Sequence, residues 1–536
     1  MKRIDYLSLA LVLIGILWGI KQRSGLPAVP LLNPDSWGYL KPALSWLSGA
    51  GFQETYGRNW LYSALLASVV RLSGNFRSIV SLQHFLGLLG APLLWLTVRV
   101  WLSIFPKRSD LCHGVAVILA AMAAFAYVLS TTQIQFELTV GPEGVLAFFL
   151  LLTLIAVLVY FRARWLSCQT WPAVVSGGAS LCLCYLVVQL KPSWTLSLVP
   201  VSTLLLAGTV GRTQRALRFV PASAAIFLAG AMMILPQLLG FKHDLGARTL
   251  LPFNLVGIHA AQIVQNAERH HLIGANGPQS QEIEARFYYE LKQAWNESRT
   301  VPTKNRTLGF DPNYIMYTKD LLWAFKAENK LSDTAVINLC YTAYWRTWRE
   351  SPGLMAAKIL KQIGLFLTAP SKDLSAYALG RERLLGMAGQ PNSPAQAFLA
   401  EAESAEYANQ PACISYRREL EKVLEQDWRI KHVAIQRYLA ILFAKSAGWI
   451  QILFFAAMFP ILFYRRFCDL RLPVWSAATV AAILYGNVLT TAIAHTLDVD
   501  RYRTSYMPAL LVTLVIMMTF LLHLALVVCR PPRPEN

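Results

Sequence analysis

Long apolar stretches alternate with short polar or basic segments along most of the chain. A helix that crosses a membrane needs about 20 consecutive apolar residues, and by that measure the sequence predicts about ten spans. They lie near residues 4–20, 78–104, 112–131, 143–161, 172–190, 193–209, 219–241, 447–465, 472–494 and 506–528. The pattern therefore predicts an all-α polytopic membrane protein.

The basic residues between these stretches set the orientation. Clusters such as Lys107-Arg108 and Arg465-Arg466 all fall on one side of the membrane if the ten spans are right. Because Lys and Arg favour the cytoplasmic side, we expect both termini there. We also expect the first stretch to stay as a signal-anchor, since no small-residue cleavage site follows it.

Three regions then project to the outer side: about 21–77, about 132–142 and a long insert of about 242–446. The chain divides accordingly into an N-terminal transmembrane module (1–241), the insert (242–446) and a C-terminal transmembrane module (447–536).

Two outer-surface helices are predicted in the first of these regions. Trp37, Leu40, Leu44 and Leu47 recur at helical spacing opposite polar positions, which is typical of a helix lying along the interface. The apolar segment 60–72 is too short to span and should form a second one.

The sequence of the insert predicts a mostly α-helical periplasmic domain. Polar helical stretches occur at 281–293 and 414–425. The stretch 354–369 is apolar enough to dip into the membrane, although Lys358 and Lys361 argue against a full span.

Composition narrows the class of protein. With 55% hydrophobic and 15% charged residues, a water-soluble fold is excluded. The net charge of +19 reflects the cytoplasmic basic clusters rather than a nucleic-acid-binding face. The eight cysteines show no metal-binding spacing, and Cys340 and Cys413, both in the insert, are candidates for a disulfide on an oxidising side.

The first candidate for chemistry is Asp35, in the segment Asn33-Pro34-Asp35-Ser36-Trp37-Gly38-Tyr39-Leu40 just after the first span. An Asp at this place can cap the surface helix. It can also take a proton from an acceptor hydroxyl or amine at the membrane surface. The two roles are compatible.

A second acid stands in the next outer region, which carries Glu137 and Glu143. Pro142 followed by Glu143 fits the first turn of a helix. Alternatively, Glu143 faces Asp35, where the two acids orient an acceptor or bind a divalent metal; oxygen ligands suit Mg²⁺ or Mn²⁺.

Basic side chains on the outer side supply candidate anion sites. Lys191 either reaches the interface with its charge or neutralises a phosphate. Arg501 and Arg503 run against the positive-inside trend, and they form either a surface network with Asp residues or, with Tyr502, a phosphate and sugar site. Arg58 is a further candidate for the anion or for pairing with Asp35.

These sites, in this order, resemble the GT-C superfamily of integral membrane glycosyltransferases, in particular bacterial relatives of protein O-mannosyltransferases and lipid A aminoarabinose transferases. The similarity covers about residues 1–241 and the closing spans. It rests on the acid-Ser-x-x-Tyr-Leu sequence from Asp35 to Leu40, the segment Leu72 to Arg77, and Asp500-Arg501-Tyr502-Arg503 with Met507-Pro508.

The resemblance implies a GT-C-like fold in a bacterial inner membrane and inverting transfer of a sugar, outside the cytoplasm, from a polyprenyl-phosphate donor to an envelope glycan, lipid or protein. It implies Asp35 as the catalytic acid/base residue. Glu143 is then a second catalytic acid and, with Asp35, the metal pair if Mg²⁺ or Mn²⁺ binds. The substrate-binding residues would be Tyr39, Arg58, Lys191, Arg501, Tyr502 and Arg503. Ser36 stands where the family often has a second acid.

Three other classes of function remain open. An O-antigen ligase or polymerase would use the insert's Arg and His residues, namely His243, Arg248, His259, His270 and His271. A transporter of lipid-linked glycans should show charged spans and paired halves, neither of which is evident. A non-catalytic scaffold would tolerate changes at every candidate site.

Overall fold

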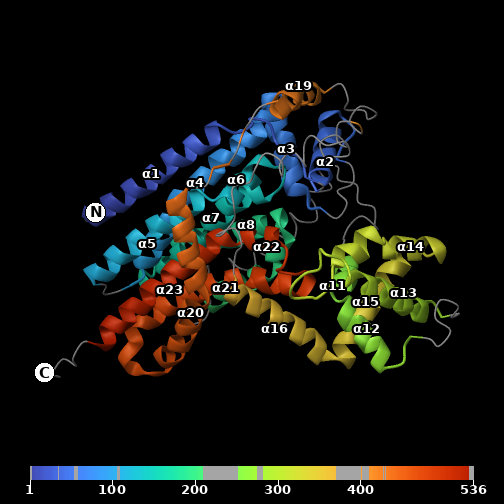
Figure 1. Cartoon of the computed structure of the whole chain (residues 1–536). Helices are drawn as coiled ribbons and strands as arrows, with labels where there is room; N and C mark the ends of the chain where they lie inside the picture. Colours follow the sequence, from blue (N-terminus) through green and yellow to red (C-terminus); the bar gives the residue numbers. More distant parts are fainter. Residues whose placement is uncertain are drawn as a thin grey trace.

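The computed structural model describes residues 3–33, 35–52, 58–105, 109–208, 251–273, 282–369, 410–425 and 433–529, together with residues 400, 428, 430 and 431. Within these ranges the secondary structure is helical apart from one isolated parallel β-bridge, between Leu31 and Thr139. The predicted all-α class is therefore confirmed (Figure 1).

The helices run as follows. The N-terminal part holds α1 (Arg3–Ser24), α2 (Trp37–Leu47), α3 (Trp60–Ser73), α4 (Arg77–Leu102), α5 (Asp110–Val128), α6 (Thr131–Leu138), α7 (Glu143–Phe161), α8 (Thr170–Leu190), the short η2 (Pro192–Ser197) and α9 (Leu198–Ala207). The middle part holds α11 (Leu251–Ile258), α12 (Ala260–Arg269), α13 (Ile283–Ser298), α14 (Leu321–Glu328), α15 (Asp333–Glu350), α16 (Pro352–Thr368) and α19 (Pro411–Glu425). The C-terminal part holds α20 (Ala434–Phe463), α21 (Arg471–Ala494), α22 (Asp500–Ser505) and α23 (Met507–Val528).

Eight of the described helical segments are long and apolar enough to cross a membrane, which makes the chain a multi-pass membrane protein. They coincide with eight of the ten predicted stretches. The stretch near 193–209 forms only a shorter apolar segment, Pro192–Ala207, because Pro192 ends α8 and starts a separate turn. The stretch near 219–241 lies outside the described residues.

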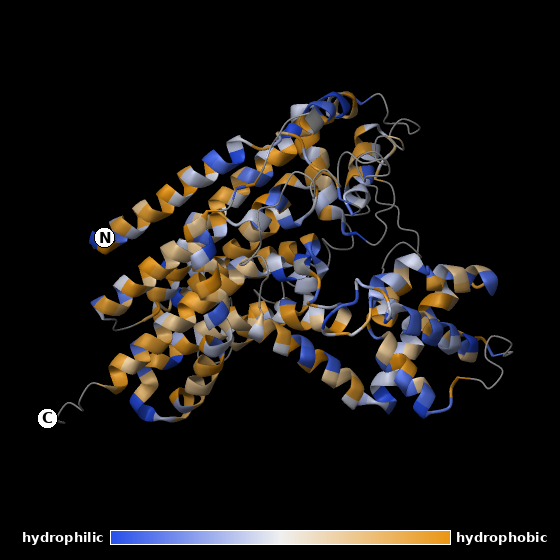
Figure 2. Ribbon diagram, in the orientation of Figure 1, coloured by the Kyte–Doolittle hydropathy of each residue, from blue (hydrophilic) through white to orange (hydrophobic). Residues whose placement is uncertain are grey.

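Small residues let the first helices of the bundle pack closely. On α1, Gly15 and Gly19 face Phe125 and Val128 of α5, so a Cβ at either glycine would press against those side chains. Close approach of this kind is how membrane helices associate without a hydrophobic driving force. Large apolar side chains of α1 and α20 are exposed instead, among them Leu17, Trp449 and Phe459. Most of both helices is orange in the hydropathy colouring (Figure 2).

The middle part of the chain divides between two hydrophobic clusters. Helices α11 to α15 share a core of their own, whereas α19 packs on the transmembrane bundle, where the Tyr416 hydroxyl donates to the carbonyl of Pro30 at 2.9 Å. Cys340 belongs to the first cluster and Cys413 to the second, and both are free thiols. The disulfide considered between them is therefore absent, because each cysteine is buried among different helices.

Helix α16 connects these two parts of the molecule. It is the segment 354–369 for which a membrane-dipping helix was predicted, and it runs from the α11–α15 group to α20 and α21 (Figure 1). At 17 residues it is not among the eight candidate spans. Lys358 and Gln362 lie on its buried face.

Candidate active site

The first two outer regions are joined by backbone hydrogen bonds. The amide of Leu31 donates to the carbonyl of Leu138 at 2.7 Å, and the amide of Val140 donates to the carbonyl of Leu31 at 3.1 Å. This bridge fixes the start of the first outer region against the end of α6. The residues that follow each strand-like segment, Asp35 and Glu143, are thereby brought to the same place.

A compact turn then sets the position of Asp35. The Ser36 hydroxyl donates to the carbonyl of Val140 at 2.8 Å, and the amide of Asp35 donates to the Asn33 side-chain oxygen at 2.9 Å. Helix α2 starts at Trp37 with Ser36 as its N-cap residue, and no side-chain cap bond is made there. The carboxylate of Asp35 is therefore not used as a helix cap.

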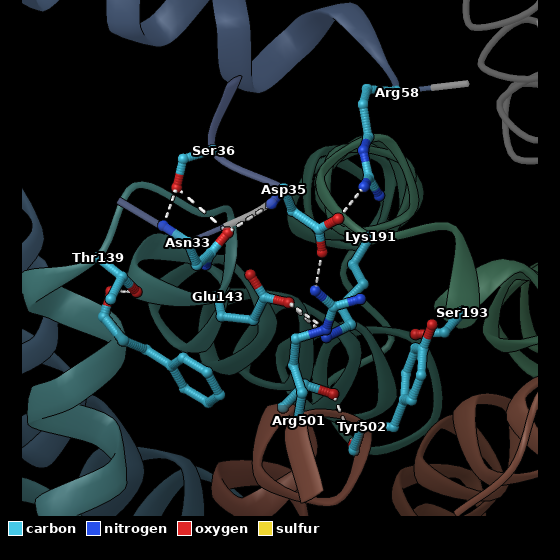
Figure 3. Close-up of polar contacts among 12 residues, drawn as sticks. Asn33, Asp35, Ser36, Arg58, Thr139, Glu143, Lys191, Ser193, Arg501 and Tyr502 are labelled. Carbon is cyan, nitrogen blue, oxygen red and sulfur yellow. Dashed lines mark hydrogen bonds and ion pairs between the residues drawn. The ribbon is translucent and has the colours of Figure 1, made fainter. Parts of the chain in front are cut away.

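Two arginines hold that carboxylate instead. Oδ1 of Asp35 accepts from Arg58, and Oδ2 accepts from Arg501, which comes from α22 near the other end of the chain (Figure 3). The Asp35 side chain remains 29% exposed. The acid is thus fixed by two guanidinium groups and still reachable from solvent.

Glu143 forms the second half of the cluster. Its Oε1 accepts from Lys191 Nζ at 2.8 Å and lies 3.6 Å from Nε of Arg501. The side chains of Glu143 and Lys191 are only 10% and 7% exposed. Lys191 consequently does not extend to the interface; it faces the site, and Arg501 lies between the two carboxylates (Figure 3).

Two tyrosine rings lie beside the cations of the cluster. The ring of Tyr502 lies 5.1 Å from Lys191 Nζ, and the ring of Tyr39 lies 5.5 Å from the guanidinium carbon of Arg58. Cation–π contacts of this kind hold a charged group beside a flat apolar face. The predicted substrate-binding tyrosines are thus both at the cluster.

The cluster carries a net positive charge. Burial alone would raise the pKa of Asp35, but Arg501 and Arg58 outweigh it and lower that pKa below its usual value, so the carboxylate is ionised at neutral pH. Burial raises the pKa of Tyr39 and of Tyr502, which keeps both phenols protonated. With Glu143 also ion-paired, three cations surround two anions and leave one unit of positive charge.

The predicted metal pair, Asp35 and Glu143, does not fit a divalent cation in this arrangement. Arg501 stands between the two carboxylates, and Arg58 and Lys191 occupy their other sides. A metal ion would have to displace at least one of these cations from a site that is already positive. Over the described residues, no cluster of three or more His, Cys, Asp or Glu side chains could hold a metal.

Arg503 is not part of the cluster, although the sequence groups it with Arg501. Residues two positions apart on a helix point about 200° away from each other, so Arg503 faces the opposite side of α22. It is 2% exposed, and its guanidinium donates to the carbonyls of Ala369 and Asp498. The geometry assigns it a contact with the backbone around α22 rather than with the site.

Glu137, the other acid of the second outer region, forms a separate buried ion pair. Its carboxylate accepts a hydrogen bond from Arg23 Nε at 2.6 Å and lies 2.9 Å from Nδ1 of His84. Gly87 on α4 makes room for it, because a Cβ there would collide with the carboxylate. In the sequence, the signal for this pair is Arg23, a basic residue that directly follows the first apolar stretch on its predicted outer side.

Sequence reasoning also missed a buried network behind Glu143. The Tyr62 hydroxyl donates to Gln83 Oε1 at 2.8 Å and accepts from the amide of Gly141 at 3.0 Å. The Gln83 side-chain amide donates to the carbonyls of Glu137 and Thr139. These contacts fix the backbone that leads into α7, and so the position of Glu143.

Two of the insert's histidines, His259 and His270, lie at opposite ends of α12. His259 is fully buried against Tyr344 and bonds the carbonyl of Leu255, while His270 is exposed near Glu350. His243 and Arg248 lie outside the described residues. One histidine does lie at the cluster: the ring of His495 is 4.4 Å from that of Tyr502, and burial, with Arg501 and Lys358 nearby, lowers its pKa to about 3.

No known protein family model matches the chain, and no curated protein matches its sequence. Among solved structures, it is similar to the oligosaccharyltransferase AglB from Archaeoglobus fulgidus in complex with an inhibitory peptide and a dolichol-phosphate, at 11% identity and a TM-score of 0.40, over 99% of this chain and 52% of AglB. It is also similar to the A. fulgidus oligosaccharyltransferase tethered with an acceptor peptide, at 11% identity and a TM-score of 0.38, over 96% of this chain and 49% of that one.

A third similar structure is ArnT from Cupriavidus metallidurans bound to undecaprenyl phosphate, at 14% identity and a TM-score of 0.30, over 91% of this chain and 77% of ArnT. The chain spans about half the length of the two oligosaccharyltransferase structures. Both kinds of protein are members of the GT-C superfamily that the sequence motifs resemble. TM-scores below 0.5 do not establish a shared fold, so the function of this chain has to follow from its own residues.

Proposed function

We propose that the chain is a glycosyltransferase that moves a sugar from a polyprenyl-phosphate-linked donor to an envelope glycan, lipid or protein. The reaction takes place on the outer side of the membrane, which in a bacterium is the periplasmic side of the inner membrane. The observation that carries the proposal is the ionised, partly exposed Asp35, fixed by Arg58 and Arg501. Lys191 and Glu143 complete a cluster assembled from four outer segments.

The net charge of the cluster favours one particular class of donor. Arg58, Lys191 and Arg501 exceed Asp35 and Glu143 by one positive charge. A sugar linked through a single phosphodiester carries one negative charge and would neutralise the site. A pyrophosphate-linked donor carries two and would leave an excess negative charge in a largely buried place, which is costly. The charge balance therefore supports a monophosphate-linked sugar.

The chemistry uses Asp35 as a general base. It accepts the proton of the acceptor hydroxyl or amine while the acceptor atom attacks the anomeric carbon from the side opposite the phosphate. The bond from that carbon to the phosphate oxygen breaks, its electron pair leaves with polyprenyl phosphate, and the configuration inverts. Lys191 and Arg501 stabilise the charge on the departing phosphate, the larger contribution to the rate. The reaction is balanced without a metal ion.

Purified protein in lipid nanodiscs tests the proposal. Radiolabelled hexoses and pentoses are supplied on polyprenyl monophosphate or on polyprenyl pyrophosphate, together with an envelope extract as acceptor. We expect label to leave the monophosphate donor and release polyprenyl phosphate. Transfer from the pyrophosphate donors alone would contradict the charge argument, and no transfer or binding of either donor would overturn the function.

A further inference from the structure

The segment that leads into α22 is held by a lysine from the insert. Lys358 of α16 donates from Nζ to the carbonyl of Ala492 at 2.5 Å and to the carbonyl of His495 at 2.7 Å. Both carbonyls belong to the end of α21, where the last turn of a helix leaves its acceptors without intrahelical partners. Lys358, a residue of the insert, thus caps the C-terminal end of α21.

A glutamine one turn further along α16 holds the next residues. The amide of Leu497 donates to Gln362 Oε1 at 2.6 Å, and the Thr496 hydroxyl donates to the same atom at 3.2 Å. The Gln362 side-chain amide in turn donates to Thr307, which donates to Asp498. Two parts of the insert, α16 and the segment of Thr307, therefore fix residues 495–498.

These contacts lie immediately before the arginine of the site. Asp498 is three residues from Arg501, and the ring of His495 packs on Tyr502. Helix α22 has only six residues, too few to hold a shape of its own. Its position therefore depends on contacts with the rest of the protein, and the segment that the insert holds leads directly into it.

Burying a lysine for this purpose is expensive, so its presence calls for a reason. The Lys358 side chain is 4% exposed, and the nearest opposing charge is that of Asp498. An apolar side chain of the same length would fill the space without the cost of removing an ammonium group from water. What the Lys358 amino group supplies, and an apolar side chain does not, is the simultaneous hold on two carbonyls.

We propose that Lys358 and Gln362 are positioning residues, through which the insert sets the place of the Arg501 guanidinium between Asp35 and Glu143. The role of Arg501 in holding a donor phosphate rests on the proposed function; the positioning of α22 does not. The insert is thereby coupled to the donor site through α16, so a molecule that docks on the insert and shifts α16 would change donor binding.

The first arm of the test needs no substrate. Amide hydrogen exchange of residues 496–505 is followed by mass spectrometry in the full-length protein, in Lys358→Met and in Gln362→Leu. Lys361→Met, at an exposed position of the same helix, is the matched control. We expect exchange to be several-fold faster than in the native protein in the first two variants, and to be unchanged in the control. Unchanged exchange in both variants would overturn the proposal, and Gln362→Leu decides the matter if Lys358→Met does not fold.

The second arm asks whether the effect passes through Arg501. Binding of polyprenyl phosphate is measured for Lys358→Met and for Arg501→Ala, alone and combined. A displaced guanidinium should weaken binding by about tenfold or more in the native background and have little effect once Arg501 is gone. Equal losses in both backgrounds would overturn the coupling. If the unaltered protein binds no polyprenyl phosphate, the proposed function fails, while the exchange measurement still decides the positioning of α22.

Discussion

Asp35 and Arg501 are ion-paired in the folded protein although 466 positions separate them in the chain. The pair joins the first outer region to α22, just before the last span, and it holds the proposed base ionised before any substrate arrives. A donor phosphate that takes over part of the Arg501 guanidinium would weaken this pairing and so raise the basicity of Asp35. The contact that keeps the acid in place is thus also one that a donor can loosen.

The shape of the Arg501 side chain, and not only its charge, should matter. Arg501→Lys keeps the positive charge, but a single ammonium nitrogen replaces the planar fork whose separate nitrogens, Nη1 and Nε, face Asp35 and Glu143. We expect kcat to fall by roughly 100-fold. Steady-state transfer kinetics measure it, with the exposed Arg269→Lys as control. A Lys variant as active as the native protein would contradict the bridging role.

Substitutions of Glu137 and of Glu143, the two acids of the second outer region, should have different effects on stability and transfer. Glu137→Gln leaves Arg23 buried without its partner, which costs about 3–5 kcal/mol, and we expect a clearly lower melting temperature in detergent. Glu143→Gln likewise removes the partner of a buried cation, Lys191, and should also lower the melting temperature, but it changes a residue of the proposed site and should in addition lower the transfer rate of the folded protein, which Glu137→Gln should not. The reverse outcome, with a stable and inactive Glu137→Gln, would place the second acid of the site at Glu137.

Stability should rise with pH through the titration of Lys358. Burial lowers its pKa to about 7, against the opposing effect of Asp498, whereas the unfolded chain keeps the ordinary value of 10.5. Between these values the unfolded state binds more protons, so the free energy of unfolding increases as pH rises from 7. His259 and His495 also face this region; burial lowers the pKa of both, so neither titrates in this window.

The measurement is the melting temperature at pH 7 and pH 9 for the native protein and for Lys358→Met. We expect an increase in the native protein that is smaller in the variant, with Lys361→Met behaving as native. An identical increase in all three proteins would mean that Lys358 does not titrate in this range.

The acidic limb of the rate–pH profile should depend on Arg58. Arg501 and Arg58 lower the pKa of Asp35, so its ionised form, the one that can accept a proton, is present at neutral pH. This form is lost only as the pH falls through the lowered pKa. Removing one guanidinium in Arg58→Ala should move this limb of kcat/KM to higher pH. An unchanged limb would show that another group titrates there.

Much of this cluster could be predicted because its charges break the rules of membrane topology. Lys191 and Arg501 stand at the predicted outer ends of apolar stretches, where the positive-inside trend argues against them. Asp35 is an acid close to the membrane surface, where burial of a charge is costly. The spans that carry them follow from length and hydropathy alone. The sequence therefore singles out these charged residues before the fold is known, and the structure brings them together.

Other features depend on directions and pairings that hydropathy does not encode. Arg503 lies two residues from Arg501, and only the rotation of α22 shows that it points away. Glu137 and Glu143 look alike in sequence, and the partner that separates their roles, Arg23, comes from another helix. In the same way, the sequence shows Lys358 only as a charge that argues against a membrane span. Its carbonyl partners are 134 and 137 positions away, so its contacts with them become visible only in the fold.

The most direct test of the account is transfer from a polyprenyl-monophosphate sugar by Asp35→Asn. Asparagine has the same size and keeps one side-chain oxygen, which can accept a hydrogen bond from Arg58 or Arg501, but it cannot take a proton. The matched control is Asp320→Asn, an exposed residue of the insert with a left-handed backbone that Asn tolerates well. We predict kcat at least about 100-fold lower, with donor affinity no weaker than native, since the cluster becomes more positive, and with a melting transition that shows the variant is folded. Native kcat in Asp35→Asn would contradict the assignment of Asp35 as the base.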